Sequence, residues 1–491
     1  MNLALELNGK DWKKMKILLF LFFTTIRVYS APTNLILTQK EVTRLVVETS
    51  HKAHETTLKY QQLRLTPLQK LSVYDWTLSA ESGYEWDRNE GPLHPSSLTN
   101  QTYKTNIFLK KNLITGTNLS FEYSRKSLYG REMNLLSKSI NQYTFDLLGL
   151  TVEQNLWRNA FGTQDRAELE SAELIYQANS ITRASELQDL VLESLRLYWN
   201  TYVAQENFSE ALASRDRYQR FVNELKRKTA YGYSNNYELY QIEAELENRE
   251  QLIKTNSLEY LKNLDLLSQL INLPQETNIQ FPKIETIPDI PNVKIIYKPE
   301  TRTIKSQSFK IKAAEADLNV SRSQDNPILS LNGSLYGSGF DELPSLAESH
   351  LLSGAYPKYY IGLKFIVQFG SGYGSENILS KKAALELEQQ KYQRLSEELQ
   401  NNRSHVERKV QTTFYSVEST KKQLMLREKT TSEMQKSFNN GRIDISLLID
   451  SMNKLFNLKV QYIRAIGDYF ITLNEWAALN DELILNPEVI K

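Results

Sequence analysis

The chain has 491 residues, with 59 lysines and arginines against 58 aspartates and glutamates, and it contains no cysteine. The lack of cysteine excludes a cysteine nucleophile and a lipid carried by a mature N-terminal cysteine. Hydrophobic residues make up 41% of the chain and charged residues 24%, which is ordinary for a soluble protein. No apolar run of about eighteen residues follows the first thirty, which excludes an ordinary transmembrane helix.

The first thirty residues have the pattern of a secretory signal peptide. Lysines precede an apolar core at residues 17–25, and Val28, Tyr29 and Ser30 form a small-residue cleavage site before Ala31. The core is too short to cross a bilayer as a helix. We therefore predict that residues 1–30 direct export and are removed, with either Met1 or Met15 as the true start.

A long unit then appears twice, at residues 31–273 and 300–480, before a tail at 481–491. In each copy we expect a short helix, β-patterned segments, a helix of about seventy residues and a helix running back. Proline is absent from 163–273 and 375–486, where the only glycines are Gly232, Gly441 and Gly467. Since both residues break helices, long helices are expected at about 163–230 and 375–439, with return helices at about 234–272 and 443–478. At 1.5 Å per residue, each long helix would measure roughly 100 Å.

Between the copies, residues 274–299 hold five prolines, which predicts an extended linker on the outside.

The β-patterned segments lie at about 71–157 in the first copy and at about 327–338 and 357–369 in the second. Within 74–86 and 359–369, apolar residues alternate with polar or small ones, and aromatic residues stand at both ends of the apolar face. Such aromatic girdles are typical of strands that cross a membrane. One such strand alone would favour a soluble sandwich, whereas two behind a signal peptide favour the membrane. The expected lipid-facing girdle is Tyr74, Trp76, Tyr84, Trp86, Tyr359 and Phe369.

The return helix of the second copy carries a coiled-coil period. Its stripe has spacings of four and three residues, and Lys459 is its one interruption. A second apolar row, Phe456, Ile463, Phe470 and Ala477, widens the stripe, so this helix is expected to pack on more than one neighbour. The stripe is Leu448, Met452, Leu455, Lys459, Tyr462, Ile466, Tyr469, Leu473 and Trp476.

The order of these elements resembles that of the TolC-like outer-membrane efflux proteins, and the likeness covers nearly all of the mature chain. The junctions at 156–162 and 368–370 resemble the family's glutamine–hydrophobic–glycine entry into the long helix. The turns around Gly232 and Gly441 resemble its periplasmic tips. The resemblance implies an α+β membrane protein, in which two structural repeats per chain form a trimeric transmembrane β-barrel continued by a long α-helical periplasmic barrel. Residues 103–125 depart from the family pattern as an extra hairpin, either inside the barrel or outside it.

The resemblance also implies a function and partners. It indicates the outer-membrane channel of a tripartite efflux or type I secretion system, a passive exit duct in the cell outer membrane with its helices in the periplasm. Expected partners are two further copies of the chain in a homotrimer, outer-membrane lipid, a periplasmic adaptor, and an inner-membrane pump that is either proton-driven or an ATP-binding exporter. A structural coiled-coil tether or surface adhesin is the alternative.

The periplasmic tip is the expected gate. By resemblance, Asp450 matches an acidic position of the second tip and Glu238 an acidic link of the first. The family's other acidic position corresponds to Leu447 here, and its usual tyrosine and arginine correspond to Phe438 and Ile443. The closing network is thus partly missing, but Arg442 and Asp444 stand close enough in the sequence to take the place of the missing partners. The predicted gate comprises Gly232, Glu238, Gly441, Arg442, Asp444, Leu448 and Asp450. A solvated Asp450 that caps the return helix is the alternative.

Motifs for catalysis are absent from the sequence, and we expect neither enzymatic activity nor a cofactor. Residues 370–374 are glycine-rich but lack phosphate-loop spacing, so they are expected to form a hinge between strand and helix. His51 and His54 share a helix face without a clear third metal ligand. The basic residues between Arg215 and Lys228 lie at the end of a long helix, where cations complement the helix dipole, so no nucleic acid is expected.

Overall fold

The computed structural model describes residues 35–89, 98–135, 138–232, 235–273, 279–284, 286–290, 300–370 and 372–484. The predicted signal peptide and much of the proline-rich linker lie outside these ranges. The described chain divides into two compact units. The helical unit draws on residues up to 50, 193–289 and 416–471, and the strand unit holds the remainder.

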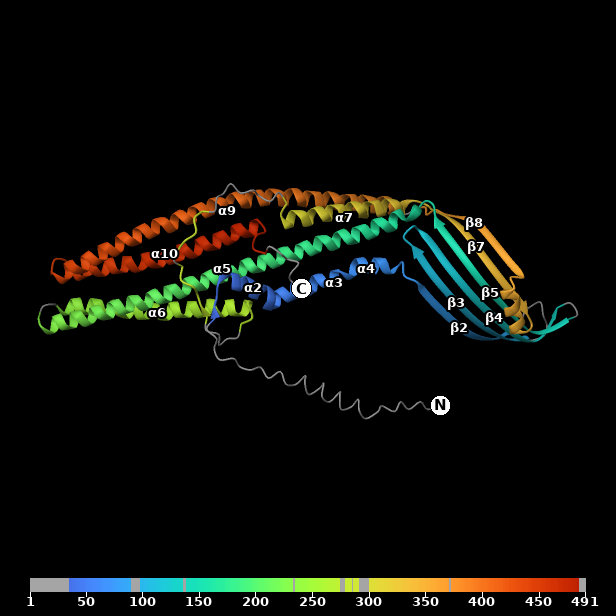
Figure 1. Ribbon diagram of the computed structural model, residues 1–491, viewed down its shortest axis with the longest axis horizontal. Coiled ribbons are helices and arrows are strands. Elements are labelled where there is room, and N and C mark those ends of the chain that lie inside the picture. The colour runs from blue at the N-terminus through green and yellow to red at the C-terminus, as the bar shows by residue number, and fades with distance from the viewer. Residues whose placement is uncertain are drawn as a thin grey trace, which may run out of the picture. The chain divides into compact units, whose positions relative to one another are not determined.

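Two helical hairpins dominate the helical unit. The long helices are α5 (Thr163–Ala230) and α9 (Tyr373–Asn439), and only their later parts belong to this unit. The return helices are α6 (Asn236–Leu270) and α10 (Ile445–Leu479). Figure 1 shows each pair as a long antiparallel hairpin. The chain can reverse at Gly232 and Gly441 because their φ angles of 76° and 68° lie in the left-handed region, which glycine adopts without strain.

The hairpins pack around an apolar core near their turns. Its buried members come from three helices and are Tyr218, Phe221, Val222, Leu225, Ile242, Leu246, Ile445 and Leu448. The coiled-coil stripe of α10 faces inward, and none of its members is exposed. Its one charged member, Lys459, lies 3.6 Å from Glu210 of α5 and 3.7 Å from Glu428 of α9. The charge is therefore tolerated in the stripe because two carboxylates lie beside it.

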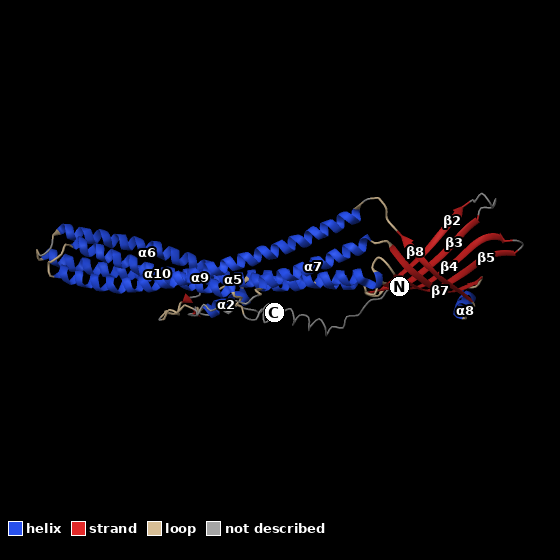
Figure 2. Ribbon diagram, turned by 90° about the horizontal axis from the view of Figure 1, so that it is seen from above, coloured by secondary structure: helices blue, strands red, loops and turns tan. Residues whose placement is uncertain are grey.

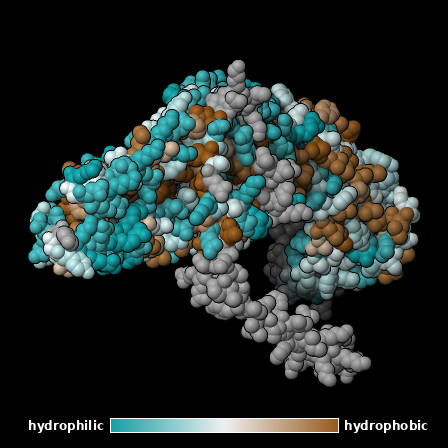
Figure 3. Space-filling model, turned by 60° about the vertical axis from the view of Figure 1, so that its left-hand side comes forward, coloured by the Kyte–Doolittle hydropathy of each residue, from teal (hydrophilic) through white to brown (hydrophobic). Residues whose placement is uncertain are grey.

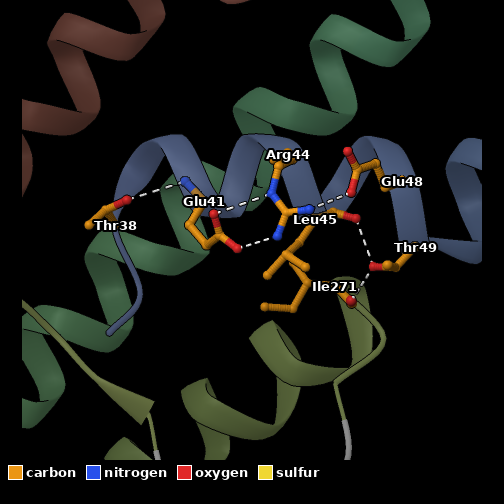
Figure 4. Close-up of polar contacts among 7 residues, drawn as sticks. All are labelled: Thr38, Glu41, Arg44, Leu45, Glu48, Thr49 and Ile271. Carbon is orange, nitrogen blue, oxygen red and sulfur yellow. Dashed lines mark hydrogen bonds and ion pairs between the residues drawn. The ribbon is translucent and has the colours of Figure 1, made fainter. Parts of the chain in front are cut away.

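The first described residues, from Leu35 on, and the described part of the linker pack together in the helical unit. Strand β1 (Leu35–Ile36) pairs in parallel with β6 (Ile279–Gln280), and Tyr469 donates a hydrogen bond of 2.9 Å to the Pro288 carbonyl. Helix α2 (Gln39–Thr49) begins where the Thr38 hydroxyl accepts from the Glu41 amide (Figure 4). Arg44 lies between Glu41 and Glu48, and the Thr49 hydroxyl donates to the Ile271 carbonyl at 2.6 Å.

The strand unit contains one antiparallel sheet. Within the described residues it has six strands in the order β2-β3-β4-β5-β7-β8 (Figures 1 and 2). Short helices precede or join them, namely α3 (His51–Leu63), α4 (Leu65–Ser72), α7 (Arg302–Asp325) and α8 (Pro344–Leu352). The strands are β2 (Thr77–Asn89), β3 (Leu98–Leu113), β4 (Thr117–Leu135), β5 (Lys138–Asn155), β7 (Ile328–Asp341) and β8 (Tyr356–Ile366).

The extra hairpin at 103–125 belongs to this sheet. Its strands β3 and β4 pair with each other and with β2 and β5 on either side. The turn between β3 and β4 packs on the start of α5: a Cβ on Gly162 would lie 1.7 Å from the Ile114 carbonyl oxygen. The short 3-10 helix η1 (Ala160–Gly162) forms this junction. The sequence left open whether this hairpin lies inside or outside the strand array. The structure shows that it extends the sheet.

The ends of the predicted girdle differ from expectation. Strand β2 begins at Thr77, so Tyr74 and Trp76 precede it, and Phe369 follows the end of β8. The chain turns first, because the Tyr74 amide donates to the Leu71 carbonyl. Burial, with the nearby carboxylates of Asp165 and Glu168, raises the pKa of Tyr74 to about 12. Tyr74 thus lies half-buried beside α5 and is not part of the strand face.

Candidate functional site

An open pocket of about 700 Å³ lies in the helical unit, where the two hairpins turn. It brings together four of the predicted gate residues, Glu238, Gly441, Arg442 and Asp444. The rest of its lining is Leu225, Lys228, Phe438, Asn439 and Ile443. The turn between α9 and α10 therefore lies against the ends of α5 and α6.

Asp444 holds this turn in place. It accepts hydrogen bonds from the Ser446 amide at 2.8 Å and from the Ser446 hydroxyl, which caps the start of α10. These bonds hold the pKa of Asp444 below its usual value, and a hydrogen bond from Tyr237 of α6 lowers it further. Asp444 thereby links the first turn of α6 to the first turn of α10.

Glu238 stabilises its own helix. Its carboxylate accepts from the Asn235 amide at 3.3 Å and forms a capping box with the Asn235 side chain. Asp450 lies on α10, exposed, and forms an ion pair of 2.7 Å with Lys454 one turn further on. The pocket lining includes neither Asp450, Gly232 nor Leu448, and Leu448 is buried in the core. The structure thus assembles part of the predicted gate set around one pocket.

Arg249, Asn453 and Tyr218 form a polar cluster inside the helical unit, which the sequence alone did not predict. Arg249 of α6 is 4% exposed and donates to the side-chain oxygen of Asn453 of α10, which also accepts from Tyr218 of α5 at 2.7 Å. The guanidinium lies between the rings of Tyr218 and Phe456, at 5.2 and 4.6 Å from their centres. The sequence carried one signal: Arg249 continues the buried stripe of Ile242 and Leu246 with spacings of four and three residues.

The second candidate surface is one face of the sheet in the strand unit. One row of direct partners crosses all six described strands, namely Leu78, Leu109, Phe121, Leu150, Leu335 and Tyr359. We call this side the apolar face, and it includes Tyr84, Trp86, Ile361, Leu363 and Phe365. Leu78 is 70% exposed and Leu363 is 68% exposed. Figure 3 shows hydrophobic residues gathered over the strands. A continuous exposed apolar surface of this kind indicates contact with lipid or another protein.

The opposite side of the sheet is mostly polar, although Phe145 and Phe340 lie exposed on it. The next row of partners is Thr77, Lys110, Ser120, Thr151, Ser334 and Tyr360. Lys104 and Glu85 form an ion pair on this polar face. Thr77 and Ser79 thus lie on the other face of the sheet from Leu78. The strands have one apolar and one polar face, as the alternation predicts.

No described helix is long and apolar enough to cross a membrane. In the part of the chain that the structure describes, no cluster of three or more His, Cys, Asp or Glu side chains could hold a metal ion.

Comparison with known proteins identifies the fold. No protein-family model matches the sequence, and no curated protein matches it. Solved structures do match. CusC, described in terms of transmembrane channel formation, is 14% identical with a TM-score of 0.68, covering 92% of this chain and 95% of that one. The outer membrane protein VceC of Vibrio cholerae is 11% identical with a TM-score of 0.66, covering 90% and 96%. The CmeC outer membrane channel of Campylobacter jejuni is 13% identical with a TM-score of 0.66, covering 93% and 90%.

At these identities the likeness concerns the fold. The chain has the fold of the TolC-like outer-membrane channels over nearly its whole length.

Proposed function

We propose that the chain is an outer-membrane channel, the passive exit duct of an efflux or secretion system. The observation that carries this proposal is the exposed apolar face of a two-sided sheet. Exposed aliphatic and aromatic side chains cover it, among them Ile107, Leu331 and Ile361 at 38–78% exposure. In water this surface would drive aggregation, whereas acyl chains would solvate it. The polar face would then line an aqueous lumen.

The sheet edges support a homotrimer. Within the described residues, β2 pairs only with β3 and β8 only with β7, so each has a free edge. Unpaired backbone groups are very costly in lipid, so the edges must be joined. Three copies of the described six-stranded sheet would give a barrel of eighteen strands. The extra hairpin would thus enlarge the barrel beyond the family's usual twelve.

The helical unit would extend the duct through the periplasm. By resemblance, its tip would meet a periplasmic adaptor that connects it to an inner-membrane pump. The pump could be proton-driven or an ATP-binding exporter. A gene for a proton-driven pump beside this one would favour efflux, and a gene for an ATP-binding exporter would favour type I secretion.

The tip would act as the gate. Asp450 is exposed near the start of α10, and a threefold axis would bring three copies of it together. A ring of carboxylates in a narrow pore favours cations. Lys454 lies 2.7 Å from Asp450 and would offset part of this charge. Glu238 would take part in closure as a capping residue of α6.

Single-channel recording in planar bilayers tests the duct and its gate. Wild-type protein should give discrete, cation-selective conductance. Asp450→Ala should lower the cation selectivity and the block by divalent ions, and Lys454→Ala should raise the selectivity, because the two changes shift the ring charge in opposite directions. Unchanged selectivity in both variants would contradict the gate, and the absence of conductance would contradict the duct.

A tether or adhesin is the second candidate. That role predicts continuous heptads without paired strands, and the six-stranded sheet of the described chain does not favour it.

A further inference from the structure

Helix α8 lies directly on the apolar face of the sheet. It joins β7 to β8 and packs on β7 and β5, and Figure 2 shows it at one end of the strands. The contact is close: a Cβ on Gly339 would lie 1.8 Å from the Ala347 carbonyl oxygen. Ala347 and Leu351 are buried against the sheet, with the Leu351 side chain over Gly337. Two glycines thus let the helix touch the strand backbone.

An ion pair lies beside this helix on the same face. Arg125 of β4 binds both carboxylate oxygens of Asp146 of β5, at 2.7 and 2.9 Å, and Asp146 is fully buried. Glu348 of α8 accepts from Arg125 at 3.0 Å. Charged groups in contact with acyl chains are costly unless they are paired and covered. Helix α8 therefore completes the ion pair and covers part of it.

The remaining surface of α8 has the composition of an interfacial helix. Leu343, Leu346 and Leu352 are exposed, and so are Ser345 and Ser349. Tyrosines occupy the same end of the apolar face: Tyr103 lies 4.9 Å from Tyr84 and 5.8 Å from Tyr129 between ring centres. Tyrosine is enriched where a membrane meets water, because its ring is apolar and its hydroxyl is polar.

We propose that α8 is an interfacial helix that binds the lipid surface. Leu346 and Leu352 contact acyl chains at the outer-leaflet boundary, while Glu348 holds Arg125 and helps to screen the Arg125–Asp146 pair from lipid. Lipid is the occupant because the exposed leucines of α8 continue the apolar face on which the helix lies. The inference rests on the proposed membrane insertion of the sheet.

The chain contains no cysteine, so a single nitroxide label can be placed at will. Leu346→Cys, Leu352→Cys, Ile361→Cys and Lys436→Cys would each be labelled in the full chain in palmitoyl-oleoyl phosphatidylcholine vesicles. Labels at 346, 352 and 361 should collide with lipid-soluble oxygen more than with a water-soluble nickel chelate. The label at the exposed Lys436 position should show the reverse preference.

The outcomes separate the two proposals. If 361 prefers oxygen but 346 and 352 prefer nickel, α8 lies in water and the inference is wrong. If 346 and 352 are immobile and collide with neither reagent, another chain covers the helix, which also overturns it. If 361 itself prefers nickel, the proposed membrane insertion fails.

A glycine pair provides a second test. Gly339→Ala should displace α8 and change the collisions at a label on 352. Gly333→Ala is the matched control on the same strand and face, since no described atom lies within 4 Å of its added Cβ. Equal collisions in both variants would show that contact with the sheet does not seat the helix, contrary to the proposal.

Discussion

The sheet of the strand unit and the bundle of the helical unit use the same residue types with opposite exposure. In the bundle, Leu225 and Ile242 are fully buried, whereas Leu78 and Leu363 of the sheet are about 70% exposed. In the bundle, the core stripe lies inside, while single apolar residues such as Leu258 and Leu426 are exposed at 71% and 66%. In the sheet, one face is largely apolar and exposed, with Arg125 and Asp146 paired on it beside α8. This difference is the one that the proposed function requires, with water around the helices and lipid against one face of the strands.

The largest expected effect concerns the buried side of this comparison. Leu225→Ala should cost about 2–5 kcal/mol, because it leaves a cavity in the core of the helical unit. Leu447→Ala is the control, since Leu447 is 51% exposed and the change should cost less than about 0.5 kcal/mol. Amide hydrogen exchange in α5 and α6 would measure both, and equal costs would refute the assignment of the core.

The next effect concerns the exposed side. Leu78→Arg or Leu363→Arg should weaken assembly, by up to about 2–4 kcal/mol for a charge that reaches the bilayer midplane. Thr77→Arg and Ser79→Arg should leave assembly intact because these positions lie on the polar face. Outer-membrane fractionation of the variants is the measurement. Loss of assembly in the Thr77 and Ser79 set alone would mean that the faces are reversed, and equal loss in both sets would contradict the assignment of faces.

A third prediction tests how the helical unit holds polar groups inside. Asn453→Leu should cost about 3 kcal/mol, because the buried Arg249 and Tyr218 lose their shared acceptor. Asn457→Leu, at an exposed position one turn along α10, should cost little. Hydrogen exchange in α6 and α10 would report both variants. A cost at 457 as large as at 453 would argue against the buried cluster.

The smallest effect depends on pH. Hydrogen bonds from Ser446 hold the pKa of Asp444 below its usual value, so the cap stabilises the turn at neutral pH. That contribution is present above the unfolded pKa of about 4 and is lost as pH falls through the lower folded pKa. Thermal stability of Asp444→Ala should thus be lower than wild type at pH 7 and converge with it in acid. A difference independent of pH would contradict the carboxylate cap.

The long-range pattern of this fold was readable from the sequence. The lack of proline and glycine predicts long helices, and the alternation at 74–86 and 359–369 predicts two-sided strands, because both depend on residues close in the chain. The strand ends at Tyr74 and Phe369 were wrong, since a helical turn continues to Asp75 and a loop begins at Val367.

Other features depend on partners far apart in the sequence. Asn453 reads as an ordinary surface residue until α6 and α5 bring Arg249 and Tyr218 to it. Helix α8 has nine residues and few local signals, and its place is fixed by contact with Gly339 and Arg125. The contact between Tyr237 and Asp444 in the proposed gate could not be predicted from local sequence either, because it forms only when the two hairpins pack together.

We propose that the free sheet edges of several copies join into one barrel in the membrane. Native mass measurement of the mature protein in detergent tests it most directly. We expect three copies per particle, recovered from the outer-membrane fraction, because β2 and β8 each have one partner within the described chain. A soluble monomer that never enters the membrane fraction would contradict it.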